Sequence, residues 1–331
     1  MTCQLHTLGG GRLGVGPHTF GTAPIGNLGR ELQEDEWYGA VSAAWDAGVR
    51  YFDTAPHYGL GLAECRLAEG LAGRPRDDFM ISTKVGRRLV SATGPVYGLD
   101  TEGFAVPATH YRVRDYSRDG VLRSLEASLA RLRLDRVDIV FVHDPDDYYA
   151  EALDGAFPAL EELRSQGIIC SYGAGMNQSA MLTEFVRHTD LDVVMLAGRY
   201  TLIEQDALDD LLPECERRRV AVIAAGVFNS GLLATDRPRH SATYNYSLAS
   251  EEVRRRADRI ADVCERHGAT LPAAAAQFVL GHPAIATACL GARSASQVDR
   301  NAGLFEAPVP CGVWSELIDT GLLRPDAPVP N

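Results

Sequence analysis

The sequence predicts an α/β protein in which residues 1–331 form a single domain, a (β/α)8 TIM barrel. Short apolar segments alternate with amphipathic helical segments along the chain, as expected for repeated strand–helix units. Eight such units in 331 residues suit one closed barrel, and no linker rich in proline, glycine or serine divides them. The alternative is an open doubly wound sheet, whose glycine-rich phosphate turn should follow a first strand and open a helix.

The N-terminal part of the chain contains the first three predicted strands. Residues 5–16 are expected to form a small hairpin, because their glycines favour turns. The segment from Gly9 to Gly14 matches G-x-G-x-x-G, but no apolar strand precedes it and no helix follows, so we interpret it as a turn. The predicted barrel strands here are 18–22, 49–53 and 79–84, and the predicted helices are 35–47, which Gly48 ends, and 63–72.

A long insertion is predicted after the third strand, over residues 86–117. These residues show no clear periodicity, and loops of this length are usually functional or disordered. We expect the insertion to close over an active site, with Tyr97, Tyr111 and Tyr116 as candidate contacts.

The alternation of strands and helices continues from residue 119 to the end of the barrel. Apolar residues recur at helical spacing from Val121 to Leu132, and residues 137–142 (VDIVFV) are typical of a strand that is buried on both faces. The other expected helices are 119–132, 149–166, 178–188, 207–219, 251–267, 272–280 and 295–304. The other expected strands are 137–142, 168–174, 193–196, 220–225 and 285–290.

The composition argues against several classes of partner. A net charge of −12 and a pI near 5.2 leave no basic surface for nucleic acid or for an anionic membrane. No apolar run of about 18 residues predicts a membrane span, and the first 16 residues show no signal-peptide pattern. Seven scattered cysteines without a C-x-x-C pair indicate reduced thiols and a cytoplasmic protein, and no metal site is expected.

A single lysine, Lys84, ends the third predicted strand. Of the 32 basic residues, one is lysine and the other 31 are arginine. The compact lysine ammonium shifts its pKa readily when it is buried, whereas arginine stays charged. We therefore interpret position 84 as one that needs an amine, and the alternative is a stray surface lysine.

Three other polar residues are expected beside Lys84. Asp53, Lys84 and His143 end three different strands, and active sites of such barrels lie at the carboxyl ends of the strands. Tyr58 follows Asp53 by five residues. Taken singly, Asp53 suits a helix cap, Tyr58 a packed aromatic and His143 a core histidine. Together at one barrel mouth, the four residues predict a catalytic site.

The four residues suit proton transfer coupled to hydride transfer. An ammonium beside a phenol favours the phenolate, so Lys84 is expected to lower the pKa of Tyr58 from its ordinary value of about 10. Asp53 would keep Lys84 charged, and Tyr58 would exchange a proton near neutral pH. His143 would orient a substrate oxygen by hydrogen bonding.

These residues and their neighbours resemble the aldo-keto reductases. The matching segments are Gly21-Thr22-Ala23, Asp53-Thr54-Ala55 with Tyr58-Gly59, Ser82-Thr83-Lys84, Val142-His143, Leu232-Leu233 and Gly291-Ala292-Arg293-Ser294 to Asn301. The resemblance covers nearly the whole chain and implies NAD or NADP bound across a barrel mouth. The segment after Lys84, the run Arg114-Asp115-Tyr116-Ser117 and the run from Tyr172 to Asn177 are similar to the aldose 1-dehydrogenase branch, which acts on L-fucose, D-threo-aldoses or galactose, and to pyridoxal 4-dehydrogenase.

The resemblance also implies which residues bind the cofactor. They are Gly21, Thr22, Ala23, Asp53, Met176, Asn177, Gly226, Val227, Phe228, Ser230, Gly231, Gly291, Ala292, Arg293, Gln297 and Asn301. Family members that prefer NADP place a lysine near Gly291 and an arginine near Gln297. This chain has neither, so NAD is the expected cofactor, and Arg293 nearby keeps NADP as the alternative.

The resemblance predicts an NAD(P)-dependent oxidoreductase that oxidises an aldose at C1 to the lactone. Tyr58 is the expected general base, and Tyr58, His143 and Asp144 are the expected substrate contacts. The expected partner is a small sugar or aldehyde, and the protein is expected to be a monomer or a homodimer. Alternatives within the family are a pyridoxal 4-dehydrogenase and a general aldehyde or ketone reductase. Alternatives of other kinds are a Schiff-base aldolase with Lys84 as nucleophile and a nucleotide-binding regulatory subunit.

Overall fold

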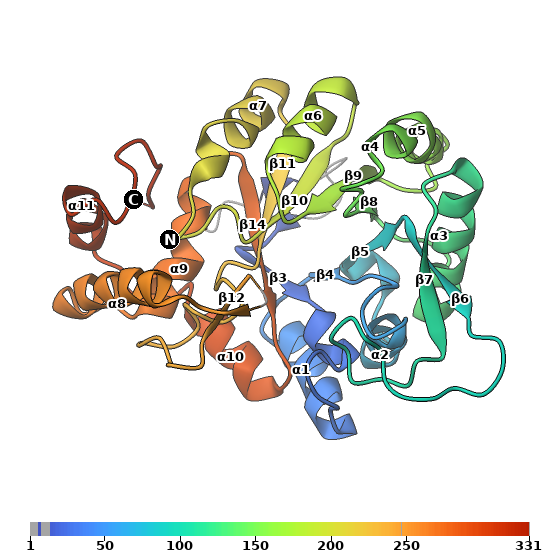
Figure 1. The fold of residues 1–331 in the computed structure, drawn as a ribbon, viewed down its shortest axis with the longest axis horizontal. Helices are drawn as coiled ribbons and strands as arrows, with labels where there is room; N and C mark the ends of the chain where they lie inside the picture. The colour runs from blue at the N-terminus through green and yellow to red at the C-terminus, as the bar shows by residue number, and fades with distance from the viewer. Residues whose placement is uncertain (1–5, 8–13, 246, 331) are drawn as a thin grey trace.

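A closed barrel of eight parallel strands forms the centre of the computed structural model, which describes residues 6–7, 14–245 and 247–330 (Figure 1). The barrel strands are β3 (His18–Gly21), β4 (Tyr51–Asp53), β5 (Met80–Val85), β8 (Ile139–His143), β9 (Ser171–Met176), β10 (Val193–Ala197), β11 (Ala221–Ala225) and β14 (Ile285–Gly291). Each strand pairs with the next one along the chain, and β14 closes the barrel against β3. The predicted (β/α)8 barrel is therefore confirmed.

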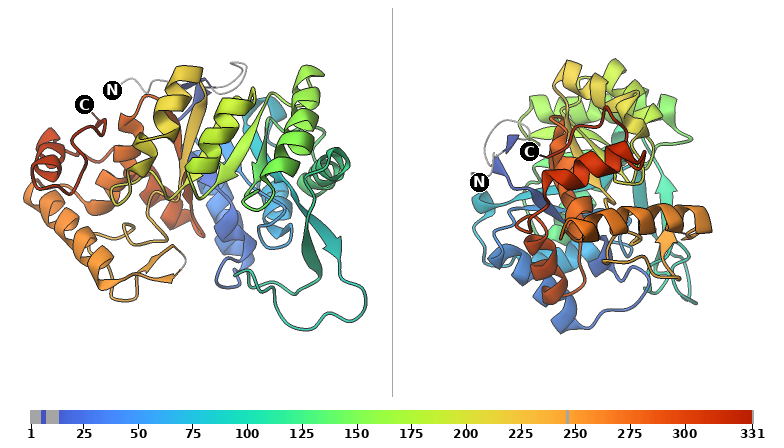
Figure 2. Two further views of the ribbon diagram at one scale, coloured as in Figure 1. Left: turned by 45° about the horizontal axis from the view of Figure 1, so that its top comes forward. Right: turned by 90° about the vertical axis from the view of Figure 1, so that its left-hand side faces the viewer.

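Helices surround the barrel on its outer side, as Figures 1 and 2 show. They are α1 (Glu34–Asp46), α2 (Leu62–Gly70), α3 (Arg118–Leu132), α4 (Tyr149–Glu151), α5 (Phe157–Ser165), α6 (Ala180–His188), α7 (Leu211–Arg218), α8 (Glu251–Arg266), α9 (Leu271–Phe278), α10 (Ala295–Gly303) and α11 (Cys311–Asp319). Short 3-10 turns are η1 (Ala23–Gly26), η2 (Arg76–Asp78), η4 (Asp206–Leu208) and η5 (Val279–Gly281). The sequence analysis did not predict α11.

The helix that the sequence predicts over 149–166 is interrupted. A π-helical segment, η3 (Ala152–Ala156), separates α4 from α5. Pro158 has no backbone N–H for the helical hydrogen-bond ladder, and the wider π turn accommodates such a residue. Gly155 lies directly against the Tyr116 carbonyl, where any Cβ would collide, so a glycine is needed at this close approach.

The N-terminal hairpin covers one end of the barrel. Its strands β1 (His6–Thr7) and β2 (Gly14–Val15) pair antiparallel, as predicted, and the remainder of the glycine motif lies outside the described residues. Val15 is buried in a cluster inside the barrel, together with Tyr51, Met80, Ile139, Phe141, Val193, Met195, Ile223, Ala286 and Cys289. Several of these residues begin their strands, so the hairpin covers the amino-terminal end and leaves the carboxyl end for a site.

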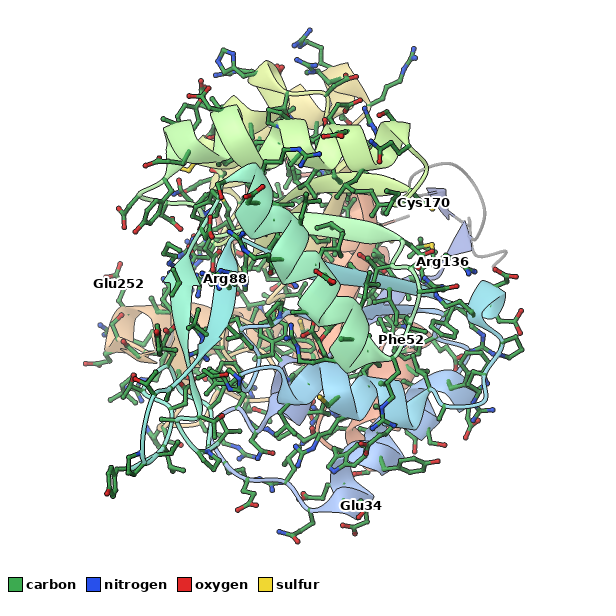
Figure 3. The ribbon with its side chains drawn as sticks, turned by 90° about the vertical axis from the view of Figure 1, so that its right-hand side faces the viewer. Glu34, Phe52, Arg88, Arg136, Cys170 and Glu252 are labelled. Carbon is green, nitrogen blue, oxygen red and sulfur yellow. The ribbon has the colours of Figure 1, made fainter. Side chains whose placement is uncertain are left out.

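The insertion after β5 is more regular than its sequence suggests. β6 (Arg87–Ser91) and β7 (His110–Arg114) form an antiparallel ribbon, which Figure 3 shows beside α3. The segment between them returns to the barrel, where Phe104 pairs with Leu28 and is buried. The expectation of a loop without regular structure is therefore wrong. The strand pattern was hidden because Arg87 and Arg112 face the protein along this ribbon, beside Leu89. A second small antiparallel pair, β12 (Thr243–Tyr244) with β13 (Ser247–Leu248), follows β11.

A buried ion pair fastens α2 to α3. The Glu64 side chain is fully buried; it accepts hydrogen bonds from Arg131 Nε at 2.6 Å and from Thr83 Oγ1 at 2.8 Å. We expect the substitution Arg131→Met to lower the free energy of unfolding by about 3–5 kcal/mol, because it leaves a buried carboxylate without its cation. Urea denaturation measures this change.

The matched control for Arg131→Met is Arg133→Met. Arg133 pairs at 3.5 Å with Glu69, and both side chains are largely exposed. An exposed pair contributes about 0–1 kcal/mol, so the control should unfold almost as the wild type does. Equal losses in the two variants would contradict the distinction between a buried and an exposed pair.

Candidate active site

Lys84 lies inside the barrel at the end of β5 and is 2% exposed. Its Nζ donates to Asp53 Oδ1 at 2.8 Å, to Asp53 Oδ2 at 2.7 Å and to the Thr54 carbonyl at 2.9 Å. Ser82 Oγ donates to Asp53 at 2.7 Å, because the register of β4 and β5 sets these two residues opposite each other. The lysine therefore occupies a fully satisfied buried position and is not a stray surface residue.

Tyr58 and His143 complete the predicted group of four at the same end of the barrel. The Tyr58 ring centroid lies 4.9 Å from Lys84 Nζ and 6.1 Å from the His143 ring centroid. Tyr58 belongs to the turn between β4 and α2, and the next residue, Gly59, has φ +63° and packs directly on Gly26. A side chain at position 59 would collide with that backbone, so the glycine fixes the approach of Tyr58 to the barrel mouth.

The ionisation of the Lys84–Tyr58 pair differs in part from the expectation. Burial raises the pKa of Tyr58 above its ordinary value; Lys84 lowers it, but by less. Burial lowers the pKa of Lys84. Asp53 and Tyr58 together raise this pKa by more than burial lowers it, so the net shift is upward. These directions favour a charged Lys84 ammonium and a protonated Tyr58 phenol at neutral pH. Lys84 lowers the pKa of Tyr58, as predicted, but burial is the larger effect, so this pKa lies above its ordinary value and not below it.

His143 ends β8 and is neutral. Burial lowers its pKa well below the ordinary value, and the positive charges of Arg87 and Lys84 lower it further. The next residue, Asp144, has the left-handed φ of +39° and bonds to the Arg87 guanidinium. A non-glycine residue in this region is strained, and such strain gathers at functional sites. Asp144 directly follows His143 at the mouth, and its strained backbone is consistent with the expected substrate contact.

The three candidate tyrosines of the insertion do not lie together over the mouth. Tyr116 is buried, and its hydroxyl donates to the backbone carbonyls of His143 at 2.9 Å and of Asp144 at 3.0 Å. Tyr97 and Tyr111 are 84% and 51% exposed. Tyr116 thus supports the strand end that carries His143, and a substrate contact by any of the three tyrosines stays a prediction.

The residues that the resemblance assigns to the cofactor surround this end of the barrel. Gly21 ends β3, and Thr22 and Ala23 follow it; Asp53 ends β4. Met176 ends β9, and Asn177 follows it. Gly226, Val227, Phe228, Ser230 and Gly231 follow β11, and Gly291, Ala292, Arg293, Gln297 and Asn301 run from β14 into α10. Val227 and Ala292 are buried in the core, so these two offer only their backbones.

Two buried polar atoms on this arc lack partners. Thr22 Oγ1 and Asn301 Oδ1 have no hydrogen-bond partner among the described residues. The amide nitrogen of Asn301 donates to the Gly291 carbonyl at 3.3 Å, which orients the side chain at the end of β14. Buried polar groups are almost always paired, so unpartnered atoms next to a strand end point to a polar ligand.

The loop after β11 contains several residues in the left-handed backbone region. Gly226, Asn229, Ser230 and Gly231 have φ values of +60°, +44°, +58° and +97°. Left-handed residues in such turns aim neighbouring N–H groups towards one side, which suits phosphate oxygens. This loop and the β14–α10 connection belong to adjacent strands.

Sequence reasoning missed three residues of the mouth. His57, Phe104 and Arg87 lie beside Tyr58 or His143: the ring centroids of His57 and His143 are 5.5 Å apart, and those of Tyr58 and Phe104 are 6.2 Å apart. Arg87 reaches the site through Asp144. The fold of the insertion decides what Phe104 and Arg87 contact, so nothing in the sequence indicated that they lie at the mouth. His57 could have been found, because it directly precedes Tyr58 in the sequence.

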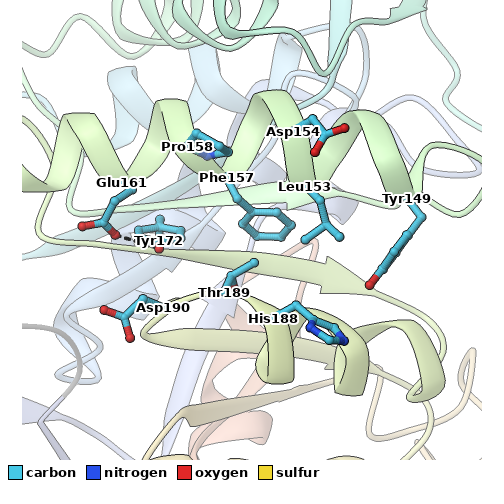
Figure 4. Close-up of a pocket in the computed structure, with 10 residues that line it drawn as sticks. All are labelled: Tyr149, Leu153, Asp154, Phe157, Pro158, Glu161, Tyr172, His188, Thr189 and Asp190. Atoms are coloured by element: carbon cyan, nitrogen blue, oxygen red, sulfur yellow. Dashed lines mark hydrogen bonds between the residues drawn. The ribbon is translucent and has the colours of Figure 1, made fainter.

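A separate hollow of about 550 Å³ lies on the outer surface, between α5 and the end of α6 (Figure 4). It is lined by Tyr149, Leu153, Asp154, Phe157, Pro158, Glu161, Tyr172, His188, Thr189 and Asp190. None of these belongs to the barrel mouth, and the Tyr172 hydroxyl donates to Glu161 at 2.8 Å within the wall. Over the described part of the chain, no helix is long and apolar enough to cross a membrane, and no group of three or more metal-ligating side chains occurs.

Comparison with known proteins agrees with the fold. The sequence profile of the Aldo/keto reductase family matches residues 18–318. A D-threo-aldose 1-dehydrogenase from Pseudomonas sp is 43% identical over 307 residues, which cover 92% of this chain and 93% of the relative. A pyridoxal 4-dehydrogenase from Microbacterium luteolum is 36% identical over 322 residues, which cover 92% and 93%. The solved structure of a glycerol dehydrogenase from Gluconobacter oxydans shares the fold, with a TM-score of 0.78, 24% identity, and coverage of 100% of this chain and 98% of that one.

Proposed function

Because this chain belongs to the aldo/keto reductase family and is an oxidoreductase, we propose that it is an NAD(P)-dependent aldose 1-dehydrogenase. The observation that carries this proposal is the group Asp53, Tyr58, Lys84 and His143 at one barrel mouth. The aldose 1-dehydrogenase relative, at 43% identity over nearly the full length of both chains, supports a sugar as the substrate.

The residues around the mouth fit a nicotinamide dinucleotide. The unpartnered Thr22 Oγ1 and Asn301 Oδ1 suit the polar edges of its sugars or bases, and the loop from Gly226 to Gly231 suits its phosphates. When it is bound, the nicotinamide supplies the hydride acceptor. This proposal assigns Met176 and Asn177, at the end of β9, to the nicotinamide side of the same arc.

The chain's own residues handle the proton and position the sugar. Tyr58 acts as a phenolate, which Lys84 stabilises; it accepts the proton of the C1 hydroxyl as the C1–H bond breaks and becomes the neutral phenol. Asp53 holds Lys84 in place through two hydrogen bonds. His143 is neutral and hydrogen-bonds the C1 oxygen, and Asp144 accepts from a neighbouring hydroxyl.

The geometry disfavours the aldolase alternative. A Schiff-base lysine needs a neutral amine with an open approach. Lys84 Nζ instead makes three hydrogen bonds, two to Asp53 and one to the Thr54 carbonyl, and its pKa is raised. Borohydride in the presence of substrate should therefore leave Lys84 unlabelled.

Pyridoxal oxidation is the second candidate function, because a pyridoxal 4-dehydrogenase is 36% identical to this chain. The two functions use the same four residues and differ in the oxidised group, a sugar hemiacetal or an aromatic alcohol or aldehyde. Turnover of aldoses and of pyridoxal by the same preparation separates them. Aldose turnover that exceeds pyridoxal turnover supports the first proposal.

We expect NAD to be preferred to NADP. Arg293 Nη2 donates to the Leu28 carbonyl at 2.8 Å, and Arg30 is paired with Glu36, so both cations are committed within the protein. Gln297 offers no charge and accepts from the Arg293 backbone N–H at 2.8 Å. A 2′-phosphate would therefore lack the charge-assisted contact that favours it.

The measurement is kcat/KM with each cofactor, in the wild type and in Gln297→Arg. The kcat/KM of the wild type should be at least about tenfold higher with NAD than with NADP. Gln297→Arg should make this NAD-to-NADP ratio smaller, because the new guanidinium can form a charge-assisted hydrogen bond with the 2′-phosphate, and such a bond contributes roughly twice a neutral one. Arg300→Gln, on the exposed side of α10, is the control and should not change the ratio. A wild-type preference for NADP would contradict the assignment.

A further inference from the structure

His57, which directly precedes Tyr58, is part of the wall of the mouth. Its ring centroid lies 5.9 Å from that of Tyr58, 5.5 Å from that of His143 and 5.2 Å from that of Phe104. The contacts with His143 and Phe104 are edge to face, with interplanar angles of 75° and 88°. Two imidazoles and the reacting phenol thus face one another at the carboxyl end of the barrel.

The insertion holds His57 in this place. Arg112 on β7 donates to the His57 carbonyl at 2.9 Å and forms two hydrogen bonds with Asp100, at 2.7 and 3.0 Å. The side chains of Arg112 and Asp100 are each 5% exposed, so the support is itself buried. Phe104 packs on the imidazole from the same insertion. The backbone and the ring of His57 are therefore both fixed before a ligand arrives.

Both histidines of the mouth have an unsatisfied nitrogen. The Nδ1 atoms of His57 and His143 are buried and have no hydrogen-bond partner within the described ranges of the chain. The Glu102 carboxylate lies 3.7 Å from His57 Nδ1, which is beyond hydrogen-bonding distance. Leaving a buried polar atom unpaired is costly, so the pair is built for a ligand with hydroxyl groups.

The charges around the mouth carry no excess of cations. Lys84 pairs with Asp53, Arg112 with Asp100 and Arg87 with Asp144. Arg114 lies opposite Arg87 in the ribbon, Glu102 lies 3.4 Å from Arg112 and 3.8 Å from Arg87, and the charge of Asp146 acts on Asp144. Among these residues, four cations face five carboxylates. An anionic substrate gains no net attraction from this set, whereas a neutral one meets many hydrogen-bonding groups.

We propose that His57 is a specificity-determining residue that, together with His143, hydrogen-bonds the hydroxyls of a neutral polyhydroxylated substrate, and that the insertion keeps its ring in position. This inference rests on the proposed aldose 1-dehydrogenase function and deepens it. Burial lowers the pKa of His57 to about 2, with Arg87 and Arg112 contributing, so the imidazole is neutral and offers one donor and one acceptor.

The test compares His57→Phe, which keeps an aromatic ring against Phe104, with His57→Gln, which keeps hydrogen-bonding groups. The control is His110→Phe on β7, whose ring bonds to its neighbour Thr109. For each protein, kcat and KM are measured with a neutral aldose and with the uronic acid that differs from it only at C6. Cofactor binding and the melting temperature are measured on the same preparations.

His57→Phe should raise KM for the neutral aldose about tenfold, in line with the loss of a hydrogen bond to a buried polar group. Its kcat, cofactor affinity and melting temperature should stay close to the wild-type values. His57→Gln should raise KM by less than His57→Phe does, and His110→Phe should behave as the wild type. The wild type should prefer the neutral aldose to the uronic acid.

An unchanged KM in His57→Phe would overturn the role of His57. Parallel losses of cofactor affinity and melting temperature would show a structural role instead. A preference for the uronic acid would overturn the neutral substrate. These failures are distinct from a failure of the proposed function. In that case the wild-type protein would turn over neither an aldose nor its uronic acid, and the role of His57 would fall with the proposed function.

Discussion

Replacing Tyr58 with phenylalanine is expected to lower kcat for aldose oxidation about 100-fold or more, the usual contribution of a general acid–base group. The ring packing near His143 and Phe104 is kept, so the loss should fall on the proton transfer. Cofactor affinity should be unchanged. Steady-state kinetics and cofactor titration measure the two quantities on one preparation.

The control for this substitution is Tyr111→Phe. Tyr111 is 51% exposed on the insertion ribbon, so removing its hydroxyl should leave kcat within about twofold, as is usual for surface substitutions. Turnover by Tyr58→Phe close to the wild-type rate would remove Tyr58 from the mechanism and, with it, the reason for a lysine beside it.

Replacing Lys84 with methionine is expected to lower both the rate and the stability. Tyr58 loses the cation that favours its phenolate, so kcat should fall about as far as in Tyr58→Phe. Among the described residues, Asp53, which is 2% exposed, keeps only the Ser82 hydroxyl as a side-chain donor, so unfolding should be easier by about 3–5 kcal/mol.

The double variant Asp53→Asn with Lys84→Met separates these two effects. It removes the uncompensated charge, so the free energy of unfolding should recover most of the loss while kcat stays low. Urea denaturation of the two single variants and the double variant completes the cycle. Additive losses in the double variant would show that Asp53 and Lys84 are not coupled.

Aldose oxidation is expected to accelerate as the pH rises. Tyr58 must be deprotonated to act as the base, and its pKa lies above its ordinary value because burial outweighs Lys84. Below that pKa, the phenolate fraction grows about tenfold per pH unit, so log kcat/KM should rise from about pH 7 towards about pH 10. Neutral His57 and His143 should add no inflection between about pH 5 and about pH 8. A flat profile would contradict a titrating phenol.

The barrel and its catalytic end could be predicted because local patterns decide them. Continuous apolar runs such as 137–142 require a strand buried on both faces, and a polar residue that ends such a run must lie at the mouth. A single lysine among arginines, at the end of a buried strand, led in the same way to Lys84. Its ion pair with Asp53 then follows from the register of two neighbouring strands.

Features that depend on distant neighbours could not be predicted. The ribbon β6–β7 looked like a loop because Arg87 and Arg112 occupy positions where an apolar residue marks a strand, and their carboxylate partners come from elsewhere in the chain. The direction of the Tyr58 pKa depends on the balance between burial and charge, which the sequence does not contain. The roles of the catalytic and cofactor residues stay predictions.

The most direct test of the proposed function is nicotinamide reduction by the purified protein, with NAD and NADP offered separately. Neutral aldoses such as L-fucose, D-arabinose and D-galactose are compared with pyridoxal at equal concentration. The proposal predicts rapid reduction of NAD with at least one aldose, slower reduction of NADP, and little with pyridoxal. Reduction with pyridoxal alone, or none with any of these substrates despite cofactor binding, would contradict an aldose 1-dehydrogenase.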